Sequence, residues 1–137
     1  MIGVDTNVLV RYIMQDDRVQ SPMAARFLDA LSSERPGYIS AVVLTEVSWV
    51  LVSTYDASRT ELANAIEVLL AADAIVVEHS ASAHRALAVC RASRADFADA
   101  FLAAINQLAG CDETVTFDKS AEFLLRFSRF KKRIFFD

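Results

Sequence analysis

The sequence contains very few of the residues that most often end regular secondary structure. Only three of its 137 residues are glycine and two are proline, whereas 22 are alanine. All-β sandwiches and barrels need many tight turns, and such turns favour glycine and proline. This composition therefore argues against an all-β fold and predicts a chain in which helices dominate.

The length and hydrophobicity indicate one folded domain. With 54% hydrophobic and 23% charged residues, the chain is too apolar for a disordered protein. We expect a single domain over residues 1–137, folded without disulfides or a structural metal. No apolar run is long enough to span a membrane, and residues 1–5 carry an acid where a signal peptide carries bases. These features predict a cytoplasmic protein with no membrane partner.

Short apolar segments alternate with longer helical ones. Strands are expected at residues 1–6, 38–40, 74–78, 114–117 and 134–136. Helices are expected at residues 7–14, 21–33, 41–55, 58–69, 81–94, 96–108 and 120–127. The valines of residues 41–55 favour a strand, but the length of that segment favours a helix. The alternation predicts an α/β fold with a central, mostly parallel sheet of four to five strands flanked by helices.

Capping residues predict where several helices begin and end. Ser21, which precedes a proline, is expected to cap the second helix. Ser58 and Glu61 form a capping box. Asp96 is expected to cap a helix that stops at Gly110.

Acidic residues stand where strands end and helices begin. Asp5 ends the apolar run of the first predicted strand and Asp118 directly follows another predicted strand, and parallel strands bring their carboxyl ends to one edge of a sheet. Glu46 lies in an apolar stretch, where a buried carboxylate would need a cation as partner. Asp96 and Asp99 are three residues apart at a helix N-terminus, so they share one face. The five carboxylates are therefore expected to meet.

Each acid taken singly has a structural explanation. Asp96 and Asp118 can be helix caps, Asp99 a first-turn acid and Glu46 a surface residue. Taken together, however, clustered carboxylates repel one another unless a cation neutralises them. An incomplete set of hard oxygen ligands suits Mg²⁺ or Mn²⁺, with water and substrate phosphate completing the coordination. The pattern indicates a divalent metal centre.

Four motifs resemble those of PIN-domain ribonucleases of the VapC toxin type. They are Val4-Asp5-Thr6-Asn7, Leu44-Thr45-Glu46-Val47, Asp96-Phe97-Ala98-Asp99 with its continuation Ala100-Phe101-Leu102-Ala103-Ala104, and Thr116-Phe117-Asp118. They stand in the order and spacing of that family and extend from residue 3 to residue 118. The resemblance therefore covers almost the whole chain.

The resemblance implies a single PIN-like domain that acts as an Mg²⁺-dependent or Mn²⁺-dependent endoribonuclease and cleaves RNA phosphodiesters with a metal-activated water. Asp5, Glu46 and Asp99 match the three most constant acids of the family, and Asp118 matches a more variable fourth. Asp96 matches an additional acid found in many members. Two polar positions that orient ligands or water are matched by Asn7 and Thr116.

The resemblance also implies partners. Such a toxin is inhibited by a cognate antitoxin that docks over the acidic crevice, and it commonly forms a homodimer. The helical surface near residues 41–52 is apolar enough to receive such a segment. Residues 119–137 carry a net charge of +4 against −8 for the rest of the chain, so this basic segment and Arg11 are candidates for contacts with RNA phosphates, or plain solvated charge.

Two other classes of protein compete with the ribonuclease. One is a catalytically silent PIN-like module that binds RNA or protein. The other is a receiver-like phosphoacceptor domain, disfavoured because Asp5 is not part of an acidic pair. His79 and His84 have no metal-ligand spacing, and Cys90 and Cys111 are expected to be buried thiols.

Overall fold

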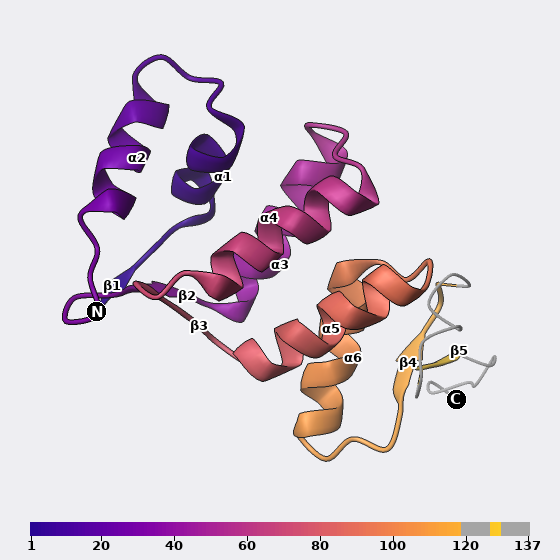
Figure 1. Ribbon diagram of the computed structural model, residues 1–137. Coiled ribbons are helices and arrows are strands. Elements are labelled where there is room, and N and C mark those ends of the chain that lie inside the picture. The colour runs from indigo at the N-terminus through magenta and orange to yellow at the C-terminus, as the bar shows by residue number, and fades with distance from the viewer. Residues whose placement is uncertain (119–126, 130–137) are drawn as a thin grey trace, which may run out of the picture.

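The computed structural model describes residues 1–118 and 127–129 (Figure 1). The elements along the chain are β1 (Ile2–Gly3), α1 (Thr6–Met14), α2 (Gln20–Asp29), β2 (Gly37–Ile39), α3 (Ala41–Ser53), α4 (Arg59–Ala71), β3 (Ile75–Val77), α5 (Ser80–Ala92), α6 (Phe97–Leu108), β4 (Thr114–Thr116) and β5 (Phe127–Arg129). The predicted α/β class is confirmed, and helices dominate the part of the chain that is described.

Three short strands form a parallel sheet in the order β1-β2-β3. Ile2 is in register with Gly37, and Gly37 with Ile75. Strands β1 and β3 are shorter than the sequence predicts, whereas β2 has the predicted length and begins one residue earlier. The first was expected to run to residue 6, but β1 ends at Gly3 and Thr6 already opens α1.

A second, two-stranded sheet joins β4 and β5 in parallel. The predicted single sheet of four to five strands is therefore divided, within residues 1–118 and 127–129, into a sheet of three strands and a sheet of two. A side-chain hydrogen bond from Asn106 Nδ2 to Thr114 Oγ1 (3.0 Å) ties β4 to α6. Phe127, expected at the end of a helix, begins β5; the rest of that predicted helix and the predicted strand at residues 134–136 lie outside the described residues.

Helix caps follow the sequence in most cases. Ser58 and Glu61 form the predicted capping box of α4, and Gly110 has the left-handed backbone (φ +92°) expected after α6. The prediction for Ser21 is wrong, because α2 begins one residue earlier. Asp17 Oδ1 accepts the backbone N–H groups of residues 19 and 20 instead, while the Ser21 side chain is buried.

Helix α3 is the central helix of the fold. In Figure 1 the pair α1 and α2 lies on one side of α3 and α4, and the pair α5 and α6 lies on the other. Helix α3 contacts α1, α4 and α6. Its side chains Leu44, Val47 and Leu51 are at most 2% exposed and pack in the core with Phe101. Burial on several sides explains why residues 41–55 carry so many apolar residues without being a strand.

The start of α3 is attached to the end of β3 by Glu78. Its Oε1 accepts the backbone N–H of Ala41 (2.8 Å), and its Oε2 accepts the hydroxyl of Tyr38 (2.9 Å). These hydrogen bonds, the one from Ala41 first, lower the pKa of Glu78 below its usual value. A helix N-terminus favours a negative charge, so the ionised carboxylate holds α3 against the sheet.

Replacing Glu78 by glutamine is expected to lower the free energy of unfolding by about 1 kcal/mol at pH 7, the value for a charged hydrogen bond discounted for solvent exposure. Because the pKa of Glu78 is lowered in the folded state, its stabilisation is present above the unfolded-state pKa and lost as the pH falls through the folded-state pKa. Urea unfolding at pH 7 and near pH 3 measures this. An equal deficit at both pH values would contradict an electrostatic role.

Candidate functional site

Asp5 lies between β1 and α1 and is the N-cap residue of α1. Its backbone is extended (φ −81°, ψ 157°), and its side chain makes no capping hydrogen bond. The carboxylate is exposed. The helix therefore does not use this carboxylate as a cap, and its oxygens are directed to solvent at the carboxyl end of the strand.

Glu46 lies on α3 and is exposed, although Leu44 and Val47, close to it in the chain, are fully buried. The expectation of a buried carboxylate that needs a cation is therefore wrong, because residue 46 falls on the solvent side of a helix whose other faces are covered. Its partner is the hydroxyl of Thr6, which donates to Glu46 Oε2 at 2.6 Å. This short hydrogen bond joins α1 to α3 and holds the Glu46 carboxylate at Thr6, the residue that follows Asp5.

Asp96 is the N-cap of α6, as predicted: its Oδ1 accepts the backbone N–H of Ala98 at 3.0 Å. Asp99, in the first turn of α6, is partly buried. Burial raises the pKa of Asp99 above its usual value, and the negative charges of Asp96 and Asp118 raise it further. Asp96, Asp99 and Asp118 therefore interact electrostatically, and the negative charge on Asp99 is disfavoured where it stands.

Thr116 and Asn7, the two residues predicted to orient ligands or water, lie in different parts of the structure. Thr116 Oγ1 accepts the backbone N–H of Asp118 at 3.0 Å, so it shapes the turn after β4. Asn7 is exposed and lines a groove between α1 and α2 together with Arg11 and Gln20. Arg11 itself pairs with Asp16 (3.2 Å) and donates to Gln20.

The structure brings these acids together in two ways. A hydrogen bond connects Glu46 to Thr6, next to Asp5, and charge interactions connect Asp99 to Asp96 and Asp118. Helix α3 contacts both α1 and α6, so the helix of Glu46 packs against the helix that follows Asp5 and the helix that begins at Asp96 and Asp99. Within the part of the chain that is described, no three His, Cys, Asp or Glu side chains are arranged to hold a metal ion. Convergence of all five carboxylates stays a prediction.

The donor set nevertheless fits a hard divalent cation. It consists of carboxylate oxygens, which Mg²⁺ and Mn²⁺ prefer. A cation near Asp99 would favour its charged form and offset the burial and repulsion that now disfavour it. The raised pKa of Asp99 is the observation that supports this fit.

The structure shows a contact of Thr6, a residue of the first motif, that was not predicted from the sequence. Thr6 is only 6% exposed, and its hydroxyl is the partner of Glu46. Its position between Asp5 and Asn7 at the start of a helix indicated a role near the acids. The partner could not be predicted, because Glu46 is 40 residues away in the chain.

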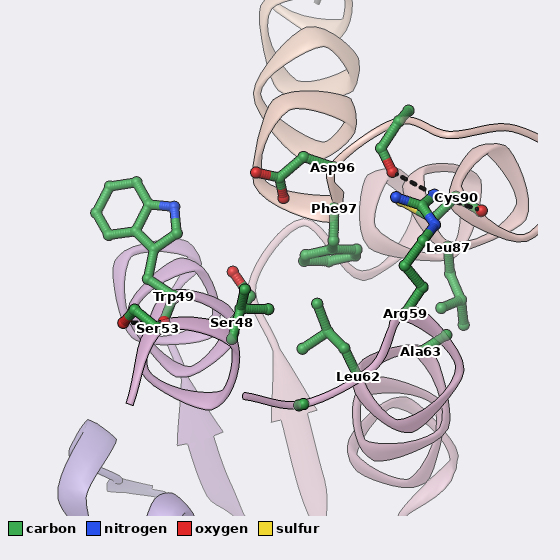
Figure 2. A pocket seen from close by; sticks show the side chains of 13 residues that line it. Ser48, Trp49, Ser53, Arg59, Leu62, Ala63, Leu87, Cys90, Asp96 and Phe97 are labelled. Carbon is green, nitrogen blue, oxygen red and sulfur yellow. Dashed lines mark hydrogen bonds between the residues drawn. The ribbon is translucent and has the colours of Figure 1, made fainter. Parts of the chain in front are cut away.

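A cavity of about 410 Å³ opens beside Asp96, between α3, α4, α5 and the start of α6. Figure 2 shows Phe97 and Leu62 facing one another across it, with Trp49 on one side and Arg59 on the other. Cys90 also lines the cavity, and burial raises the pKa of its thiol to about 11, which makes it a poor nucleophile at neutral pH.

The remaining predicted side chains lie at the surface. His79 and His84 are exposed. Cys111 is exposed as well, so the expectation that both cysteines are buried holds only in part, for the half-buried Cys90. The physical reason is position: residue 111 follows Gly110 in the turn that leaves α6.

The capping role of Asp96 leads to a test that separates it from Asp99. Replacing Asp96 by alanine is expected to lower the free energy of unfolding by about 1 kcal/mol, the usual cost of a lost N-cap. Asparagine can still cap, so Asp96→Asn should unfold close to the wild type. Thermal melts of the two variants give the comparison, and equal destabilisation by both would show that the charge of Asp96, not its capping bond, stabilises α6.

A family model of the PIN domain matches residues 2–126. The chain therefore belongs to the PIN domain family, in agreement with its parallel sheet and covering helices. PIN domains are generally metal-dependent nucleases, which gives the chain a nuclease-type function at the level of the family. Comparison with the curated proteins finds no match. Within residues 1–118 and 127–129, no helix is long and apolar enough to cross a membrane.

Proposed function

We propose that this chain is a single-domain, VapC-type toxin: a metal-dependent endoribonuclease, cytoplasmic and held inactive by a cognate antitoxin. The observation that carries the nuclease proposal is the environment of Asp99. Its charge is disfavoured by burial and by two neighbouring carboxylates, on a helix that packs against the helix of Glu46. Groups with perturbed pKa values near other titratable groups are candidates for functional sites.

Asp5, Glu46 and Asp99 are proposed as the residues that hold Mg²⁺ or Mn²⁺, with Asp96 and Asp118 as further acids of the site. When bound, the ion would supply Lewis-acid stabilisation of charge on the scissile phosphodiester and activate water for the attack. Thr6 would orient Glu46 through its hydrogen bond. Asn7 and Thr116 are proposed to orient substrate or water near the acids.

RNA is the proposed substrate. Arg11 already pairs with Asp16, so the basic residues of 119–137, which lie largely outside the described residues, are the stronger candidates for phosphate contacts. An antitoxin segment and a second copy of the chain are the proposed protein partners. Val42, Trp49 and Val52 support a protein contact on α3, because each is at least 48% exposed on the one helix face that the fold leaves uncovered.

Cleavage of RNA with and without divalent ions tests the proposal. Total RNA incubated with the protein should be cut in Mg²⁺ or Mn²⁺, and chelation by EDTA should abolish cutting. Ca²⁺ should not restore it, because Ca²⁺ prefers more ligands and a looser geometry. Full activity in EDTA would contradict a metal centre, and failure to cut in any ion, with RNA still bound, would favour the silent binding module.

A further inference from the structure

Arg59, the first residue of α4, makes four hydrogen bonds to the end of α5 and the connection between α5 and α6. Its Nη2 donates to the carbonyl oxygens of Cys90 (3.1 Å), Ser93 (2.8 Å) and Ala95 (2.8 Å). Its Nη1 donates to the carbonyl of Arg94 (3.0 Å). Figure 2 shows the guanidinium reaching across from α4 to this segment, beside the start of α6.

Of these four carbonyls, that of Cys90 lies in the last turn of α5, and those of Ser93, Arg94 and Ala95 lie in the connection between the two helices. Helix α5 ends at Ala92, and the last carbonyls of a helix have no intrahelical donor. A cation at a helix C-terminus also interacts favourably with the helix dipole. The planar guanidinium offers five donors in a fixed geometry, whereas the lysine ammonium offers three from one point. Arginine is therefore the residue type that can hold several carbonyls of this connection at once.

The connection held by Arg59 leads directly into the site. Ala95, the last of its four acceptors, precedes Asp96, which caps α6. Asp99 follows one turn later. The start of α6 is thus fixed from both sides, by Arg59 before it and by the Asp96 cap within it. A shift of residues 93–95 would move both carboxylates relative to α3.

We propose that Arg59 is a positioning residue for the acids of this nuclease site. It acts through the backbone of residues 90–95 and fixes the place from which α6 presents Asp96 and Asp99. The inference rests on the proposed function, since it assigns Arg59 to the same site. In this proposal Arg59 acts through the backbone carbonyls it holds and not by contact with RNA or the metal.

Arg91 provides a matched control. It also links α5 to α4, through Nη2 to Asn64 Oδ1 (3.1 Å) and to Glu67 Oε2 (2.9 Å). These bonds end on side chains of α4 and leave the backbone carbonyls of the α5–α6 connection untouched. Arg91→Gln therefore removes an arginine between the same two helices without releasing the segment before Asp96.

The test measures Mn²⁺ binding, by electron paramagnetic resonance of the free ion, and amide hydrogen exchange in the intact chain. Arg59→Gln should raise the Kd for Mn²⁺ about 10-fold, the effect typical of losing a residue that orients metal ligands. It should also speed exchange of the first-turn amides of α6, residues 97–100. Arg59→Lys should fall between the wild type and Arg59→Gln, and Arg91→Gln should bind Mn²⁺ like the wild type.

The possible results distinguish a failure of the Arg59 inference from a failure of the proposed function. If the wild type binds Mn²⁺ and cuts RNA while a folded Arg59→Gln keeps wild-type affinity, the Arg59 inference is overturned and the proposed function stands. If Arg91→Gln weakens Mn²⁺ binding as much as Arg59→Gln does, the Arg59 inference is also overturned, because the loss of affinity then reflects a general loss of stability. Should Arg59→Gln fail to fold, unchanged affinity in Arg59→Lys overturns it. A wild type that neither binds Mn²⁺ nor cuts RNA overturns the proposed function.

Discussion

Asp99→Asn is expected to lower the rate of RNA cleavage by at least about 100-fold, the upper end of the range for groups that support a metal site. It should also raise the melting temperature of the metal-free protein at pH 7. Activity falls because the amide is a weaker ligand than the carboxylate. Stability rises because the substitution removes a charge that burial, Asp96 and Asp118 all disfavour.

The pH dependence of this stabilisation follows from the direction of the pKa shift. The pKa of Asp99 is raised in the folded state, so the charged group costs stability above that pKa. Below the unfolded-state value of about 3.9, the carboxyl is protonated in both states and the cost disappears. The advantage of Asp99→Asn in melting temperature should therefore be present at pH 7 and absent near pH 3.

Magnesium provides a second readout. Mg²⁺ should raise the melting temperature of the wild type, by binding the folded state, and should raise that of Asp99→Asn much less. Asp29→Asn is a matched control. Asp29 is an exposed acid and the last residue of α2, and the chain after α2 enters the sheet at the end opposite the proposed site. A folded Asp99→Asn that cuts RNA at the wild-type rate would rule out a ligand role for Asp99.

Thr6→Val is expected to lower cleavage about 10-fold to 100-fold, the usual loss when a partner that orients a metal ligand is removed. Valine has nearly the shape of threonine but has no hydroxyl. The 2.6 Å hydrogen bond that holds Glu46 Oε2 would therefore be lost while the buried position stays filled. Cleavage rates over a range of Mg²⁺ concentrations measure the effect, and higher Mg²⁺ should recover part of the rate.

Thr6→Ser distinguishes the hydroxyl from the packing. Serine keeps the donor to Glu46 and loses one methyl group, so it should cut RNA close to the wild-type rate while losing about 1 kcal/mol of stability. If serine and valine at position 6 reduced cleavage equally, the methyl group rather than the hydrogen bond would matter, and the orientation of Glu46 by Thr6 would be refuted.

The class of fold, most helix boundaries and the motifs that point to the family could be predicted from the sequence. These features depend on residues close together in the chain. The Ser58 and Glu61 box, the Asp96 cap and the Gly110 terminus each act within a few residues, so their local pattern predicts their structure. The helix at residues 41–55 followed from its length alone.

The division of the strands into two sheets and the contacts between distant side chains could not be predicted, because they depend on how the elements pack. Pairing between strands involves partners far apart in the sequence, so β4 could join β5 rather than the first sheet without any local signal. Glu46 is exposed because of how α3 packs, and its contact with Thr6 spans 40 residues. The carbonyl partners of Arg59 lie 31 to 36 residues away. Such contacts arise only when helices pack, because packing determines which distant polar groups lie within hydrogen-bonding reach.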